Sequence, residues 1–413
     1  MTVGAILPDN YNNLFFAAIM DENTEGIEQL SLMHGSDSLI EIYHVTQRKV
    51  FWKALSTYPL HLAAMNRKLE SMKSLLALGA DAEKRDKQGR TSLHLVIMSW
   101  PRLLSSTKES TNVSPFRATL ITVREKAEAC LQLLCEHGVD INAEVTGVIK
   151  ETALHIAVSY SALSAVKTLI SYGASVNVLD GVGMTPLHRA AGILNKDILL
   201  YLIKQGADLN MAMTESGNTP LHIAVSVCAT MTAKPKADDL ECVAELLEHG
   251  ADPNKCNNQD RTPLQDACFM GCIELVDLLL SYGGDINKLN KDGENCLFMF
   301  LNRGVKVTSN ELLSKLFGLT TPLIFHNKSG HLPSSLMLPC SYKLKEPILR
   351  LSQEPRSLKS ICKAFIYIQH NRNRTEWQQL LPAVLYEFVF NDWDNLDRLL
   401  LDVEINNNNK SST

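Results

Sequence analysis

Histidine and cysteine are the residues of this chain that could carry catalysis or hold a metal ion, because imidazole and thiolate groups act as bases, nucleophiles and ligands. The 413 residues include 12 histidines and 10 cysteines. Seven histidines recur at fixed places in a repeated pattern, which indicates a structural role: His61, His94, His137, His155, His188, His222 and His249. The other five are scattered: His34, His44, His326, His331 and His370. We therefore expect no catalytic residue and predict that the chain is not an enzyme.

The cysteines follow no spacing that is typical of a metal site. No Cys-x-x-Cys pair occurs, and although Cys268 and Cys272 could share one helical face, no histidine lies near them in the sequence. Buried, reduced thiols are the simpler interpretation, so we expect neither a metal nor a cofactor. Scattered cysteines of this kind predict a reducing compartment, which makes the protein cytoplasmic or nuclear.

Composition and motifs exclude several further functions. The chain has no Gly-x-x-x-x-Gly-Lys, Gly-x-Ser-x-Gly or His-Glu-x-x-His motif. Its net charge is −5 at pH 7, and no dense run of Lys and Arg appears, so we expect no nucleic-acid partner. Residues 1–13 do not resemble a signal peptide, and no apolar stretch is long enough to cross a membrane. The expected partners are proteins.

One short phrase, repeated six times, organises the elements that hold the recurring histidines. Its copies start 33, 61, 33, 34 and 43 residues apart, so one period near 33 with two insertions accounts for all of them. Thr can cap a helix and Pro suits the first helical position, while Leu faces the core. The imidazole can hydrogen-bond the backbone of the turn between neighbouring repeats. The copies are Tyr58–His61, Thr91–His94, Thr152–His155, Thr185–His188, Thr219–His222 and Thr262–Gln265.

A leucine-rich stretch that ends in glycine follows each clear phrase, as in Leu75–Gly79 and Leu246–Gly250. Glycine there supplies the left-handed residue that ends a second, outer helix. A finger-like turn such as Asp86–Gly89 leads to the next phrase, and one such turn has Asp260 where Gly is usual. The 33-residue period with its Thr-Pro-Leu-His phrase resembles the ankyrin repeat. The resemblance implies an all-α solenoid of helix–turn–helix repeats with β-turn fingers, whose finger tips and inner helices contact proteins.

We predict four segments along the chain. They are an N-terminal capping unit at 1–57, an ankyrin-repeat array at 58–340, a small helical segment at 355–390, and an amphipathic helix with a polar tail at 391–413. The array holds seven or eight repeats, of which the seventh starts at Asn295 and a degenerate eighth at Asn327.

The two insertions lie near 100–125 and 230–238, at the junction of inner and outer helices. An extended outer helix is predicted from Pro115 onward, because apolar residues follow at helical spacing. Insertions on one edge can form a binding face, although tolerated loop variation is the simpler interpretation.

The helical segment after Pro355 carries a second pattern. Leu358, Cys362 and Ile366 are four residues apart, so they share one helical face that could fill an apolar pocket of a partner. Leu381 and Pro382 then open another helix with apolar residues. Following an ankyrin-like array, this pattern resembles the suppressor-of-cytokine-signalling (SOCS) box of the ankyrin-repeat-and-SOCS-box family.

That resemblance implies a function. Leu358, Cys362 and Ile366 would bind elongin C, and Leu381 and Pro382 would belong to the element associated with the choice of cullin. The chain would then be the substrate-recognition subunit of an elongin–cullin ubiquitin ligase, with elongin B, elongin C and a cullin as partners and a protein target on the array.

The segment also departs from the family pattern, because Val384 stands where a second Pro is usual and Lys363 where Arg is common. The alternative is a non-enzymatic scaffold with no ligase attached, in which 357–389 is a helical cap. Further phrases, such as Trp100-Pro101 and Leu336–Pro339, resemble one particular ankyrin-repeat protein over about Leu60 to Phe390, which implies no activity.

Overall fold

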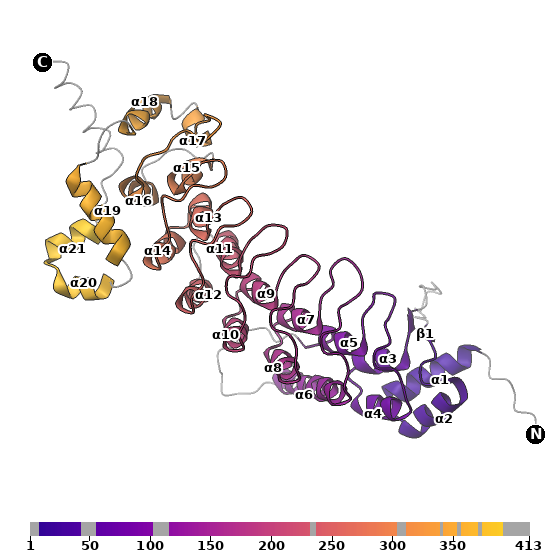
Figure 1. The fold of residues 1–413 in the computed structure, drawn as a ribbon. Coiled ribbons are helices and arrows are strands. Elements are labelled where there is room, and N and C mark those ends of the chain that lie inside the picture. The colour runs from indigo at the N-terminus through magenta and orange to yellow at the C-terminus, as the bar shows by residue number, and fades with distance from the viewer. Residues whose placement is uncertain are drawn as a thin grey trace, which may run out of the picture. The chain divides into compact units, whose positions relative to one another are not determined.

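The structure is a computed structural model, and it describes residues 8–42, 55–101, 115–231, 237–303, 311–338, 342–352, 357–370 and 374–390. The chain divides into two compact units, Met1–Ala190 and Ala191–Thr413. In each unit, short inner helices stand in a row, with finger-like loops on one side and outer helices on the other (Figure 1). The predicted helix–turn–helix repeat is confirmed.

The first unit begins with a helical pair and a short hairpin. The strands β1 and β2 pair antiparallel, with Ile40 opposite Thr57 and Ile42 opposite Leu55. This pairing was not expected in an all-α chain; the two-residue alternation of Ile40, Glu41 and Ile42 favours it, since Ile40 is buried and Glu41 exposed. The elements are α1 (Pro8–Met20), α2 (Thr24–His34), β1 (Ile40–Ile42), β2 (Leu55–Thr57), α3 (Pro59–Met65), α4 (Leu69–Ala77), α5 (Ser92–Met98), α6 (Pro115–Glu136), α7 (Ala153–Ser159), α8 (Leu163–Ser171) and α9 (Pro186–Gly192).

The second unit continues the inner and outer pairs and ends in a group of short helices. Helix α13 begins directly after Thr262, whose side chain accepts a hydrogen bond from the Gln265 N–H, and ends at Gly271 in the left-handed conformation. The elements are α10 (Lys196–Lys204), α11 (Pro220–Met231), α12 (Ala237–Glu248), α13 (Pro263–Met270), α14 (Ile273–Ser281), α15 (Cys296–Leu301), α16 (Glu311–Leu319), α17 (Ser334–Met337), α18 (Tyr342–Leu351), α19 (Leu358–His370), α20 (Arg374–Leu380) and α21 (Ala383–Phe390).

The core of each unit lies between its inner and outer helices. In the first unit Leu93 of α5 and Leu131 of α6 are buried, and in the second Leu264 of α13 and Leu279 of α14 are fully buried. A leucine transferred from water in this way stabilises the fold by about 1.5–3 kcal/mol. Because each repeat supplies such a pair, the apolar core runs along the stack without a single centre.

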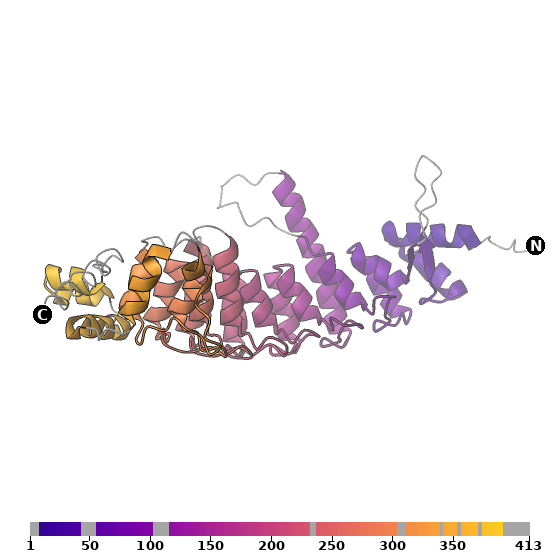
Figure 2. The same cartoon turned by 90° about the horizontal axis from the view of Figure 1, so that it is seen from above.

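The insertions lengthen helices. Helix α6 has 22 residues against nine in α4 and α8, so the predicted extension of this outer helix is confirmed. Figure 2 shows α6 reaching beyond the other helices of its unit. In the second unit α11 and α12 have 12 residues each, so part of that insertion continues both helices. The inserted segments 102–114 and 232–236, and the predicted amphipathic helix and tail at 391–413, lie outside the described residues.

Candidate functional site

The recurring histidines link each phrase to the following turn. The backbone N–H of Thr91 donates to Nδ1 of His94 over 3.2 Å, so the ring proton is on Nε2, which donates to the Ala143 carbonyl over 3.1 Å. Burial of the ring lowers the pKa of His94 to about 4. The imidazole is therefore a neutral structural donor near pH 7.

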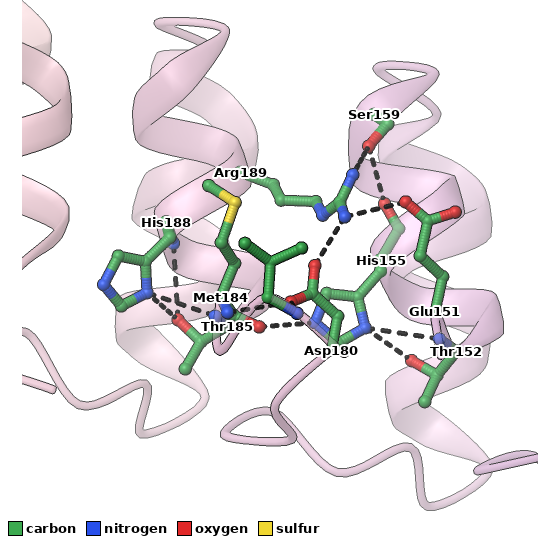
Figure 3. Close-up of polar contacts among 10 residues, drawn as sticks. Glu151, Thr152, His155, Ser159, Asp180, Met184, Thr185, His188 and Arg189 are labelled. Carbon is green, nitrogen blue, oxygen red and sulfur yellow. Dashed lines mark hydrogen bonds and ion pairs between the residues drawn. The ribbon is translucent and has the colours of Figure 1, made fainter. Parts of the chain in front are cut away.

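The other phrases repeat this geometry. Nε2 of His155 lies 3.0 Å from the Met184 carbonyl, and Nε2 of His222 lies 3.0 Å from the Arg261 carbonyl. His188 is held in the same way by Thr185 (Figure 3). At His61 the ring bonds the Lys84 carbonyl, but Nδ1 lacks a partner among the described residues, because Tyr58 replaces the capping Thr.

Gln265 reproduces the histidine with an amide. Its Oε1 accepts from the Thr262 N–H over 3.0 Å, and its Nε2 donates to the carbonyls of Lys288 and Glu294 over 2.7 and 3.0 Å. An amide, which does not gain a proton near neutral pH, thus makes the same kind of hydrogen bonds as the histidines. The recurring position therefore has a hydrogen-bonding role.

Arg189 joins two repeats of the first unit (Figure 3). Its guanidinium forms an ion pair with Glu151 at 2.7 Å and a second with Asp180, and it lies 3.3 Å from the Ser159 hydroxyl. Burial works against ionisation of Asp180, but Arg189 and two backbone N–H groups outweigh it and lower its pKa. The charge of Arg189 is therefore satisfied within the chain.

An asparagine after three of the outer helices also links repeats, and sequence reasoning missed it. Nδ2 of Asn254 donates to the Gly283 carbonyl over 2.8 Å, and Oδ1 accepts from the Asp285 N–H over 2.7 Å. The same pair of bonds occurs at Asn142 and at Asn210. An Asp-x-Asn spacing after the helix-ending glycine is the signal that could have revealed these links.

Neighbouring fingers are joined through their backbones. The Gly181 N–H donates to the Ile149 carbonyl over 2.6 Å, and the Lys291 N–H donates to the Gln259 carbonyl over 3.1 Å. The tips at Lys87, Val182 and Lys291 are exposed. Asn290, next to Lys291, is buried and its side chain donates a hydrogen bond to Glu294, so of these two residues only Lys291 faces solvent.

The last helices of the second unit pack on the array. Helix α19 contacts α14, α16 and α21. The buried Lys315 ammonium lies 2.8 Å from Asp277, and the Tyr367 hydroxyl of α19 donates to the same carboxylate over 3.1 Å. Between α19 and α21, Lys359 and Lys363 lie 4.5 and 4.7 Å from the centre of the Phe388 ring. One face of α19 is thereby fixed.

The opposite face of α19 and the nearby helices present large apolar side chains to solvent. Leu358 is 75% exposed, Cys362 is exposed and Ile366 is half-buried. Leu381 is half-buried and Pro382 is exposed. The sequence did not predict the exposure of the other large apolar side chains of this group, because it depends on how three helices pack: Ile361, Phe365, Leu380, Val384 and Leu385.

We use the name apolar module face for the exposed set Leu358, Ile361, Phe365, Leu380, Val384 and Leu385. No group of three or more His, Cys, Asp or Glu side chains in the described part of the chain is arranged to hold a metal ion. Cys268 is buried and Cys272 half-buried. Within the described ranges, no helix is both long and apolar enough to span a membrane.

Several proteins are similar to this chain. Ankyrin repeat and SOCS box protein 16 of Homo sapiens is 30% identical over 185 residues, which cover 37% of this chain and 40% of that protein. The p105 subunit of nuclear factor NF-kappa-B of Gallus gallus is 28% identical over 272 residues, covering 56% of this chain and 28% of that protein. The chain thus matches less than half the length of these curated relatives. The ankyrin repeat domain of Bcl-3 is 23% identical, with a TM-score of 0.47, over 59% of this chain and 93% of that one.

The family models account for more than half of the chain. Ankyrin repeats (3 copies) matches residues 101–180, 154–235 and 228–290, and Ankyrin repeats (many copies) matches 60–99. These ranges contain most of the histidine phrases and fingers and all three of the asparagine links described above. The chain belongs to the ankyrin-repeat family.

Proposed function

We propose that the chain is the substrate-recognition subunit of an elongin–cullin ubiquitin ligase. As an ankyrin-repeat protein it is a protein–protein interaction module; in the proposal the array holds a target and the helices α19–α21 bind elongin C. Other subunits would transfer ubiquitin. The observation that carries the proposal is the apolar module face, exposed while the other side of α19 is held by Lys315, Asp277 and Tyr367.

Burial of exposed apolar side chains would drive the proposed binding. Leu358 and Val384 are 75% and 80% exposed, and four further large apolar side chains of α19–α21 are also exposed. Each such side chain stabilises a complex by up to about 1.5–3 kcal/mol when it leaves water. Exposed apolar side chains mark an interaction site on a soluble protein where they form one continuous patch. A helix with one anchored and one exposed apolar side fits the helix-in-groove mode of binding.

Similarity to an ankyrin repeat and SOCS box protein also supports the proposal. Cullin recruitment is a separate part of it, because Val384 stands where the SOCS-box pattern has a second Pro. We further propose a cytoplasmic or nuclear location, which is supported by the free thiols of all nine cysteines in the described ranges. The likeness of some phrases to one particular ankyrin-repeat protein stays a prediction.

The test is capture of purified elongin B and C by the full chain. We expect wild type to retain the elongins and the double variant Leu358→Ser, Cys362→Asp to lose at least about tenfold in affinity, since a charge enters the contact. Leu32→Ser is the matched control, because Leu32 is also 75% exposed but lies on α2. The proposal fails when wild type retains no more elongin than the double variant, and the non-enzymatic scaffold then remains.

A further inference from the structure

One position of the repeat differs in a way that points to a ligand. The residue after His in each phrase, or after its counterpart, occupies the same place on every inner helix, and five of its seven copies are apolar. The two charged copies are Arg189, which has partners within the first unit, and Asp266 in the second. The apolar copies are Leu62, Leu95, Ile156, Ile223 and Met299.

Asp266 lies in partly buried, apolar surroundings. The equivalent positions of the flanking inner helices α11 and α15 hold Ile223 and Met299. No described side chain donates a hydrogen bond to the Asp266 carboxylate or forms an ion pair with it. Burial raises the pKa of Asp266 to about 6, and the charge of Arg261 opposes this effect. At pH 7.4 the half-buried group is therefore mainly ionised, and no cation of the described residues forms an ion pair with it.

The residues one turn further on α13 complete the surface. Phe269 and Met270 follow Asp266 by three and four residues, so they lie on the same side of the helix. Phe269 is 37% exposed and Met270 is half-buried. A carboxylate beside an accessible aromatic ring and a thioether suits a guanidinium or an ammonium on an alkyl stem, which can pair with the acid and lie against the ring.

We infer that Asp266, Phe269 and Met270 form a binding site for one arginine or lysine side chain of a target protein, in a segment whose neighbouring side chains are apolar. The flanking Ile223 and Val227, both half-buried on α11, would contact those neighbours. The inference deepens the proposed function, since it assumes that the array is the surface that holds the target. It does not depend on the binding of elongin.

The test is selection of a random 12-residue peptide library, displayed on phage, against the full chain at pH 7.4. We expect enriched peptides to contain an Arg or Lys next to apolar residues. Asp266→Asn should weaken their binding at least about tenfold, and Phe269→Ala should weaken it less. Replacing the basic residue of a selected peptide by Gln should cost affinity on wild type but not on Asp266→Asn. Asp238→Asn, at an exposed acid of the outer helix α12, is the matched control.

The inference is overturned if no peptide is enriched, if the enriched peptides lack basic residues, or if they bind Asp266→Asn as tightly as wild type. Equal loss of affinity with Asp238→Asn also contradicts it, because a general effect of negative charge would then explain the binding. Thermal unfolding shows whether each variant is folded. Elongin capture depends on residues of α19, so failure of either experiment leaves the result of the other intact.

Discussion

The buried histidines of the repeat are neutral donors, and their low basicity couples stability to pH. His94 has an ordinary pKa of 6.5 in the unfolded chain and about 4 in the folded one. The unfolded chain binds this proton more tightly than the folded chain does. Protonation of His94 therefore stabilises the unfolded state relative to the folded one. The stability that depends on neutral His94 is therefore complete above pH 6.5 and is lost as the pH falls toward 4.

His94→Gln should remove this dependence, since Gln265 shows that an amide fits the same place. At pH 7.5 we expect the free energy of unfolding to change by less than about 1 kcal/mol. At pH 5 the variant should be more stable than wild type by about 2 kcal/mol, because only wild type gains a proton on unfolding. Urea unfolding at both pH values measures this; equal acid sensitivity of the two proteins would contradict it.

For Asp266 we expect the opposite pH dependence of the free energy of unfolding. Its pKa rises from an ordinary 3.8 to about 6 on folding, so the folded state favours the neutral acid, and this contribution is lost as the pH rises through 6. Asp266→Asn should raise the free energy of unfolding by about 1–2 kcal/mol at pH 7.5, after allowance for partial exposure, and by nearly nothing at pH 4. Urea unfolding checks this too, and a destabilised variant at pH 7.5 would show that the carboxylate has a partner.

At the scale of elements, the carboxylate of Asp277 joins three helices, α14, α16 and α19. Asp277 of α14 receives both the Lys315 ammonium and the Tyr367 hydroxyl. The side chain of Lys315 is only 3% exposed. Water could therefore do little to stabilise its charge if the carboxylate were removed. Loss of the carboxylate leaves a buried cation, which is more costly than the pair was favourable.

We therefore expect Asp277→Ala to loosen α19 from α14 and α16. Hydrogen exchange of the α19 amides should accelerate about 100-fold or more, which corresponds to roughly 3 kcal/mol of lost local stability. Tyr367→Phe removes one hydrogen bond and should have an effect of about 1 kcal/mol. The amides of α11 are the internal control. Unchanged exchange in α19 would mean that apolar contacts alone hold it.

Much of this molecule follows from its sequence, because the repeat is specified locally. Thr262 caps α13 and Gly271 ends it, and both signals are visible in the chain. The pairing of β1 with β2 was missed, since three alternating residues are a weak signal. The exposure of Val384 could not be predicted either, nor that Asp266 has no ion-pair partner among the described residues, because both depend on how other helices pack around these side chains.

At the scale of the whole molecule, a stack of repeats should transmit a local defect only to near neighbours. Asn254→Ala removes two inter-repeat hydrogen bonds, to Gly283 and Asp285, and should cost about 2 kcal/mol. Hydrogen exchange should accelerate most in α13 and α14 and less with distance along the stack. Asn142→Ala breaks the equivalent link of the first unit and should shift the effect to α7 and α8. If either variant accelerated exchange uniformly along the whole chain, the repeats would instead unfold as one cooperative unit. A target bound at one repeat would then stabilise all of the repeats equally.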